Sequence, residues 1–168
     1  MINMNLNNID ELKNAGFLGF KKMHDLFKDC SSIPKTKGVY LILNPGYIEG
    51  EYLLIGTGGH FKGKNPNVSL EELTLNWVEK SLVIYIGKAG SENSSATLHS
   101  RLKQYFGFGQ GKNIGHYGGR FIWQLKNSAD LIVCWKPLLN DDPRFVENQL
   151  IKKFVTKFSK RPFANLTD

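Results

Sequence analysis

Residues 81–88 read Ser-Leu-Val-Ile-Tyr-Ile-Gly-Lys, and this apolar stretch is the first guide to the fold. Its β-branched and aromatic residues are typical of a strand. After a polar loop, Thr97 is placed to cap a helix over 98–106. Upstream, 37–43 is a second apolar run of this kind, and it ends at the turn sequence Asn44-Pro45-Gly46. These segments predict neighbouring strands with a helix packed on them.

The rest of the chain alternates in the same way. Further strands are expected at 52–55 and 131–135, and further helices within 10–28, at 69–79 and at 143–158. Residues 107–119 hold six glycines and are expected to form a long mobile loop. The expected class is α+β, with a small mixed or antiparallel sheet and helices packed on it. Residues 1–168 are expected to form one domain, with a helical extension over 1–32.

The charge is basic, with 22 Lys+Arg against 15 Asp+Glu and a net charge of +7. Between Ile86 and Ala129 six basic residues accompany a single acid, Glu92. Two interpretations are open for this segment: a solvated basic face, or a surface that binds phosphates.

Several classes of protein are disfavoured. The start of the chain, 1–12, has neither the basic nor the apolar region of a secretory signal. No apolar run approaches the roughly 20 residues that span a bilayer. Cys30 and Cys134 are isolated, so neither a zinc site nor a disulfide framework is expected. The expected setting is the reducing cytoplasm, with no membrane partner.

Glu147 is placed unusually on the last expected helix. At 100° per residue, the apolar residues of that helix fall within roughly 60° of Glu147 on either side; they are Leu150, Ile151, Phe154 and Phe158. A carboxylate on a buried face is costly unless it is paired or binds a metal. Glu147 is therefore either half of a buried Glu–Arg pair or a functional group.

The helix capped by Thr97 repeats the pattern, because Arg101 shares a face with Leu98, Leu102 and Tyr105. An inward guanidinium can clamp a phosphate oxygen, since its fork matches that geometry. It can equally be the partner of Glu147.

Together these residues resemble the GIY-YIG nuclease family. Gly38-Val39-Tyr40 looks like its GIY element, and Tyr85-Ile86-Gly87 matches its YIG element, followed by Lys88. Arg101 on the next helix, Tyr105 four residues later, Glu147 on a late helix and Asn165 near the end complete the order.

The resemblance implies a three-stranded antiparallel sheet flanked by helices, and a metal-dependent endonuclease that cuts nucleic acid, with DNA favoured. Glu147 would bind one Mg²⁺ or Mn²⁺. Arg101 would neutralise phosphate charge, Tyr40 is the candidate base, and Tyr85 would orient water or phosphate. Basic neighbours and the metal are expected to lower the pKa of Tyr40. The candidate substrate-binding residues are Gly87, Lys88, Tyr105, His116, Arg120 and Asn165.

One departure from the family pattern is large. The two motif tyrosines usually lie about a dozen residues apart on neighbouring strands, but Tyr40 and Tyr85 are 45 residues apart. An insertion over 44–80 must leave the sheet and return. We expect it to flank the site together with 107–119 and to set substrate choice.

Other interpretations remain open. Residues 58–65 nearly match a phosphate-binding loop, but Asn65 replaces the Ser or Thr that would contact Mg²⁺. A nucleic-acid-binding domain that kept the fold without catalysis is the main alternative function. A protein partner or an appended targeting module would fit either function.

Overall fold

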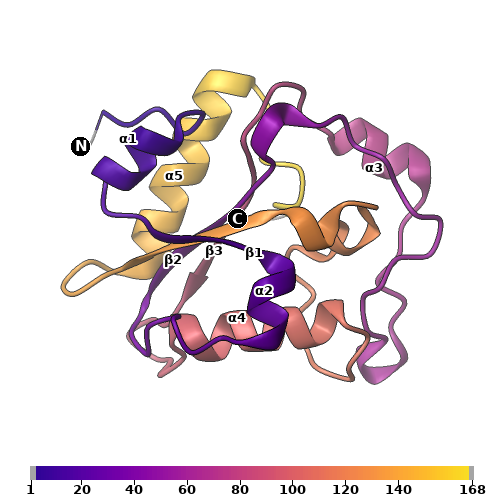
Figure 1. The fold of residues 1–168 in the computed structure, drawn as a ribbon, viewed down its shortest axis with the longest axis horizontal. Helices are drawn as coiled ribbons and strands as arrows, with labels where there is room; N and C mark the ends of the chain where they lie inside the picture. The colour runs from indigo at the N-terminus through magenta and orange to yellow at the C-terminus, as the bar shows by residue number, and fades with distance from the viewer. Residues whose placement is uncertain (1–2, 167–168) are drawn as a thin grey trace.

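The computed structural model describes residues 3–166, in which helices and strands alternate (Figure 1). The strands are β1 (Leu18–Lys22), β2 (Gly38–Leu43), β3 (Val83–Ala89) and β4 (Ile132–Pro137). The helices are α1 (Ile9–Asn14), α2 (Met23–Lys28), α3 (Leu70–Asn76), α4 (Leu98–Gly109) and α5 (Pro143–Phe158). Short 3-10 turns lie at Pro45–Tyr47, Phe61–Gly63, Arg120–Gln124 and Ser128–Asp130. The expected α+β class is confirmed.

The strands form one antiparallel sheet in the order β1-β4-β2-β3. The sheet has four strands in the described residues, so the expectation of three was wrong. The segment expected to be a helical extension contains two short helices, α1 and α2, with a strand between them. The additional strand is β1. Its sequence gave no strand signal because only Phe20 is even partly buried. Backbone pairing with β4 holds it, and Gly19 permits that approach, since an added Cβ would lie 2.6 Å from the Trp135 ring.

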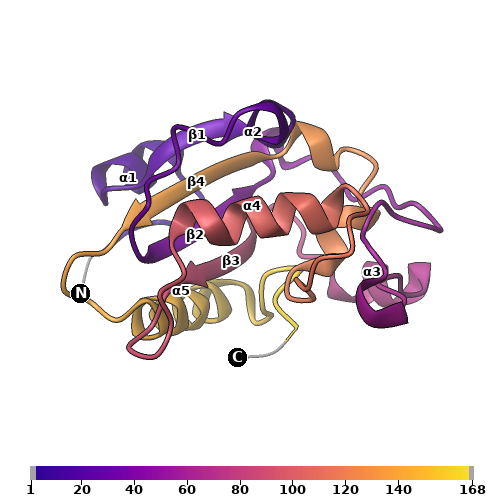
Figure 2. The same cartoon turned by 90° about the horizontal axis from the view of Figure 1, so that it is seen from below.

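Helices cover both faces of the sheet, with α4 on one side and α5 on the other (Figure 2). All six residues of β2 are buried, and alternate ones serve different cores. Tyr40 and Ile42 join the core under α4, whereas Val39, Leu41 and Leu43 join the core under α5.

The expected helix starts are confirmed. The Thr97 hydroxyl accepts the Ser100 N–H and the Ser100 hydroxyl accepts the Thr97 N–H, which closes a capping box at the start of α4. Asp142 caps α5 by accepting the Phe145 N–H. Ser69 caps α3 in the same way, although α3 ends at Asn76 rather than Glu79.

Helix α4 runs three residues beyond its expected end, so the first glycines of 107–119 are helical. Gly109 is needed there, because an added Cβ would lie 2.3 Å from the ring of Trp123. Tight packing thus offsets the cost of glycine in a helix.

The insertion 44–80 folds back onto the rest of the chain. Tyr52–Ile55 is no strand and makes only an isolated bridge from Tyr52 to Leu125. The Gln124 side chain secures the insertion by hydrogen bonds to the backbone of Leu53 and Val68. Among residues 3–166, no helix combines the length and apolar character needed to cross a bilayer.

Candidate active site

Three tyrosines meet where β2, β3 and α4 come together. The ring centroids of Tyr40 and Tyr85 are 6.0 Å apart, and those of Tyr85 and Tyr105 are 5.7 Å apart. Gly87 makes the arrangement possible, because an added Cβ would lie 2.3 Å from Cζ of Tyr40. We call these three residues the tyrosine cluster, and it is buried, with Tyr40 exposed by only 1%.

The Tyr40 hydroxyl interacts with the side chains of Tyr85 and Arg101. Burial raises the pKa of Tyr40 to about 12, and Arg101 offsets this only in part. The expectation that basic neighbours lower this pKa is therefore wrong for the arrangement seen here, since desolvation outweighs them. Burial also raises the pKa values of Tyr85 and Tyr105.

Glu147 lies on the other side of β3, on the inward face of α5. Its side chain is 16% exposed, and one carboxylate oxygen lies 3.5 Å from Nζ of Lys88. Desolvation raises the pKa of Glu147, while Lys88 and then Arg101 oppose the shift. The ion-pair partner is thus a lysine of β3, and Arg101 lies close enough to interact with both Glu147 and Tyr40.

Few side chains near Glu147 could act as metal ligands. Residues 3–166 contain no group of three or more His, Cys, Asp or Glu side chains placed to bind one ion. Glu147 offers one hard carboxylate here, beside Lys88 and Arg101. A site of that kind suits Mg²⁺ or Mn²⁺, which keep several waters and take further oxygens from a bound phosphate.

The chain segment 115–119 closes over the tyrosine cluster. The Tyr105 hydroxyl donates to the Gly119 carbonyl at 2.9 Å, and Gly119 takes a left-handed φ of 73° against the Tyr85 ring. His116 is 1% exposed, with its ring centroid 4.6 Å from that of Tyr105.

The buried imidazole of His116 has no hydrogen-bond partner for either nitrogen among the described residues. Burial, reinforced by Arg101, lowers the pKa of His116 to about 3. His116 was expected on a mobile loop, either solvated or at the phosphate. It is instead a neutral, buried side chain that packs against Tyr105 of the tyrosine cluster.

Asn165 and Arg120 were also expected at the site, and they contact different parts of it. The Asn165 side chain pairs with the backbone of Ile86, donating to its carbonyl at 2.8 Å and accepting its N–H at 2.9 Å. It extends the β3 edge and positions the strand beside Gly87. Arg120 lies over the rings of Tyr117 and Phe121, at 4.8 and 5.4 Å from their centroids.

Sequence reasoning missed one charged neighbour of the site. Arg144 lowers the pKa of Glu147 through its charge. It lies three residues before Glu147 on α5, and this spacing brings side chains together on a helix surface. That spacing was the available signal.

The insertion packs on the end of α4 and on 115–119. The Gly59 N–H donates to the Phe108 carbonyl at 2.8 Å, and the Tyr117 hydroxyl donates to the Asn65 carbonyl. Nζ of Lys64 lies 6.0 Å from the Tyr117 ring centroid. Residues 56–67 therefore pack on the segment that covers the tyrosines.

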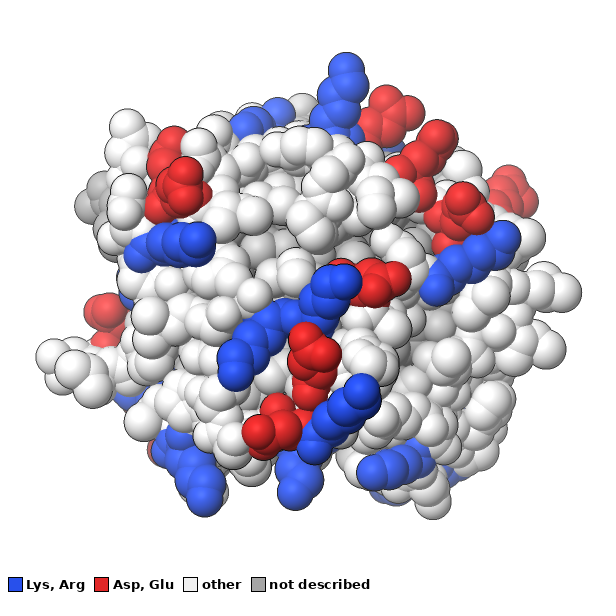
Figure 3. All heavy atoms as spheres, in the orientation of Figure 1, with Lys and Arg blue, Asp and Glu red and all other residues white. Residues whose placement is uncertain are grey.

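The face shown in Figure 3 carries cationic and anionic side chains intermixed, so this face is not a continuous basic surface. Within the segment expected to be basic, Lys126 is paired with Glu51 at 3.3 Å. Arg101 is the cation that interacts with Tyr40 of the tyrosine cluster, whereas Lys88 pairs with Glu147.

Compared with protein-family models, curated proteins and solved structures, the chain gives no significant match. The likeness to a known family therefore stays a resemblance carried by the motif residues themselves.

Proposed function

We propose that the protein is a metal-dependent phosphodiester hydrolase of the GIY-YIG type, an endonuclease acting on nucleic acid, with DNA the favoured substrate. One observation carries the proposal. Tyr40, Tyr85, Arg101 and Glu147 come from four separate elements and interact around one point of β3. Convergence of a phosphate-binding cation, a carboxylate and hydroxyl groups is what such hydrolysis needs.

The charged residues would handle the phosphate. Arg101 would bind a non-bridging phosphate oxygen, and Glu147 would hold the divalent ion. When bound, that ion supplies charge stabilisation at the phosphoryl and leaving oxygens. Lys88 now neutralises Glu147 at 3.5 Å and would be released toward the phosphate as the ion takes its place.

The tyrosines would orient and deprotonate the attacking water. A water oxygen bonds to phosphorus, the bond to the leaving sugar oxygen breaks, and a proton of the water passes to the phenolate oxygen of Tyr40, which must first release its own hydroxyl proton to solvent. Tyr85 would orient the water. Because Tyr40 is buried with a pKa of about 12, this step requires 115–119 to lift away first.

The residues proposed to contact substrate fall into two groups, according to whether their side chains already form hydrogen bonds within the protein. Gly87 and Lys88 lie on β3 at the site, and Arg120 flanks the covering segment. Tyr105 and Asn165 already bond to Gly119 and Ile86, so they would shape the site. His116 would reach substrate only after the segment moves.

One observation favours the alternative, a catalytically silent domain of the same fold that binds nucleic acid. The tyrosine cluster is closed to water, and its hydroxyls are used within the protein.

Cleavage assays separate the two functions. Supercoiled plasmid, linear duplex, branched DNA, single strands and RNA are incubated with Mg²⁺, Mn²⁺ or EDTA. We expect cleavage with metal and none with EDTA. Glu147→Gln should abolish cleavage while retaining the fold and most affinity for nucleic acid. Glu71→Gln, on the exposed surface of α3, is the matched control. Metal-independent cleavage, or full activity in Glu147→Gln, would refute the assigned role of Glu147; binding without any cleavage would support the silent alternative.

A further inference from the structure

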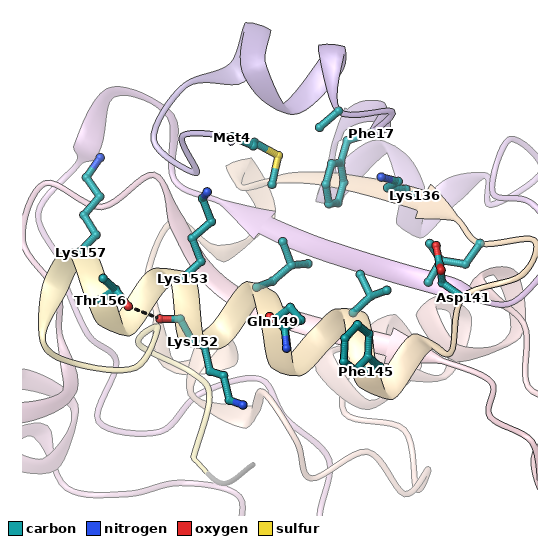
Figure 4. Close-up of a pocket in the computed structure, with 14 residues that line it drawn as sticks. Met4, Phe17, Lys136, Asp141, Phe145, Gln149, Lys152, Lys153, Thr156 and Lys157 are labelled. Atoms are coloured by element: carbon teal, nitrogen blue, oxygen red, sulfur yellow. Dashed lines mark hydrogen bonds between the residues drawn. The ribbon is translucent and has the colours of Figure 1, made fainter. Parts of the chain in front are cut away.

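A cavity lies on the α5 side of the sheet, and none of the residues that line it belongs to the tyrosine cluster. It has a volume of about 700 Å³ and runs between α5, the N-terminal segment and the end of β4 (Figure 4). Cavities of roughly 300–1,000 Å³ with mainly apolar walls are typical of sites for small ligands. We call it the α5 cleft.

The floor of the α5 cleft is apolar and belongs to the core. Met4, Phe17, Leu138 and Leu150 line it, and each is at most 8% exposed. Phe145 forms the outer lip and is 61% exposed. A bound hydrocarbon chain would cover this ring and replace water along the floor, and burial of apolar area favours both.

The two ends of the cleft differ in charge. At one end Lys153 and Lys157 lie four residues apart on α5, so they are neighbours on the helix surface. Figure 4 shows both side chains reaching from α5 toward the N-terminal segment. Nζ of Lys157 donates to the Asn5 side chain at 2.8 Å, and no carboxylate of residues 3–166 lies within 4.0 Å of it. The other end holds the one lining carboxylate, Asp141, together with Lys136.

The length of the α5 cleft also suits a ligand with a hydrocarbon chain. From Phe145 to Lys157 the cleft follows α5 for about 18 Å at 1.5 Å per residue. The cleft is apolar along its floor, with two lysines at one end and a lysine beside a carboxylate at the other. It therefore fits a single acyl chain that ends in an anion, because the floor matches the chain and the more cationic end matches the head.

We propose that the α5 cleft binds a single-chain anionic amphiphile, with its carboxylate or phosphate head at Lys153 and Lys157 and its chain lying over Leu150 toward Phe145. The site is separate from the proposed nuclease centre and does not depend on that function.

The test uses simple probes below their micelle concentrations. Dodecanoate, dodecyl phosphate, dodecanol and dodecyltrimethylammonium are titrated into the full chain by calorimetry. We expect saturable binding of both anions, and binding at least about tenfold weaker for the alcohol and the cation, since removing the head charge forfeits the lysine contacts. The better of the two anions identifies the head group.

Two pairs of variants locate the site. Val146→Trp fills the cleft and should abolish binding, whereas Val155→Trp, on the same helix but not lining the cleft, should leave it intact. Lys153→Met with Lys157→Met should weaken anion binding about tenfold and leave alcohol binding unchanged. Lys28→Met with Lys35→Met, remote from the cleft, should leave the binding of both ligands unchanged.

Thermal unfolding shows whether each variant is folded, so that a loss of binding can be assigned to the cleft. Each variant is used only if it unfolds cooperatively, and a bound amphiphile should raise the Tm of the natural chain but not that of Val146→Trp. Equal affinity for dodecanol and dodecanoate, or equal weakening by the two tryptophan variants, would overturn the proposal. A dimer in sedimentation that Val146→Trp dissociates, without amphiphile binding, would overturn it too and assign the cleft to a second copy of the chain.

Discussion

The two halves of the candidate site differ in how much water reaches them. On the α4 side the tyrosine cluster is closed, with Tyr40 exposed by 1% and the Tyr105 hydroxyl bonded to Gly119. On the α5 side Glu147 is 16% exposed and Lys88 33% exposed. The charged half is open to an incoming phosphate, whereas the hydroxyl half is not. Under the proposed function, substrate would therefore meet the charged half first, and chemistry at Tyr40 would require a movement that exposes its hydroxyl.

The largest expected effect comes from removing the charge shared by both halves. Arg101→Met keeps an unbranched apolar stem on α4 but removes the cation that interacts with Tyr40 and Glu147. We expect cleavage to fall about a hundredfold or more, because a transition-state charge loses its fixed partner. Single-turnover rates measure this, with the exposed Lys103→Met on the same helix as control. A loss below threefold would exclude Arg101 from the chemistry.

Packing in the closed half of the site can be disrupted by a substitution at Gly87. Gly87→Ala places a Cβ against the Tyr40 ring, in a core where neither strand can retreat, so we expect a loss of about 3 kcal/mol in the free energy of unfolding. Gly118→Ala is the control, because its Cβ would meet only the Tyr85 hydroxyl, at 3.3 Å. Urea titration compares them, and equal stabilities would show that the Tyr40 ring is not held against β3.

The covering segment should respond to pH through His116. Its folded pKa of about 3 lies below the ordinary value of 6.5, so the unfolded chain binds more protons between these values. Stability therefore falls as pH falls below 6.5, by about 2 kcal/mol between pH 7 and pH 5. His116→Phe keeps the ring and removes this dependence, while Glu147, whose pKa is raised, contributes the opposite slope in both proteins.

Denaturant unfolding at a series of pH values measures the difference between the natural chain and His116→Phe. Hydrogen exchange at 115–119 adds a local readout, since protonation should open this segment before the sheet unfolds. Parallel pH profiles for the two proteins would show that His116 is not buried as neutral imidazole.

The smallest effect is expected from the insertion. Substituting Lys62, Lys64 and Lys112 by Ala should weaken nucleic-acid binding severalfold and flatten its salt dependence, because fewer counterions are released. Turnover at saturating substrate should change little, since the three lysines are exposed and none is assigned to the chemistry. Binding titrations across salt concentrations test this. An unchanged salt slope would place substrate elsewhere.

Local signals predicted much of this architecture. Thr97 and Asp142 begin their helices where expected because a side-chain oxygen before an apolar repeat satisfies the first free N–H groups. The inward position of Glu147 followed from helical periodicity alone. These features depend on residues close together in the chain.

Features decided by tertiary contacts could not be read from the sequence. β1 is exposed along most of its length and exists because β4 offers backbone partners. The burial of His116 depends on 115–119 closing over Tyr105, a contact no local pattern encodes. The high pKa of Tyr40 follows from its burial, another tertiary effect, which is why charge reasoning gave the wrong direction.

The most direct test of the central claim, that the two halves act as one site, is a double-mutant cycle of Arg101→Met and Glu147→Gln in single-turnover cleavage. Residues that act together lose little more when both are removed than when one is. We expect the double variant to be within about threefold of the more damaged single variant. Losses that multiply would contradict the account, because Arg101 and Glu147 would then act independently.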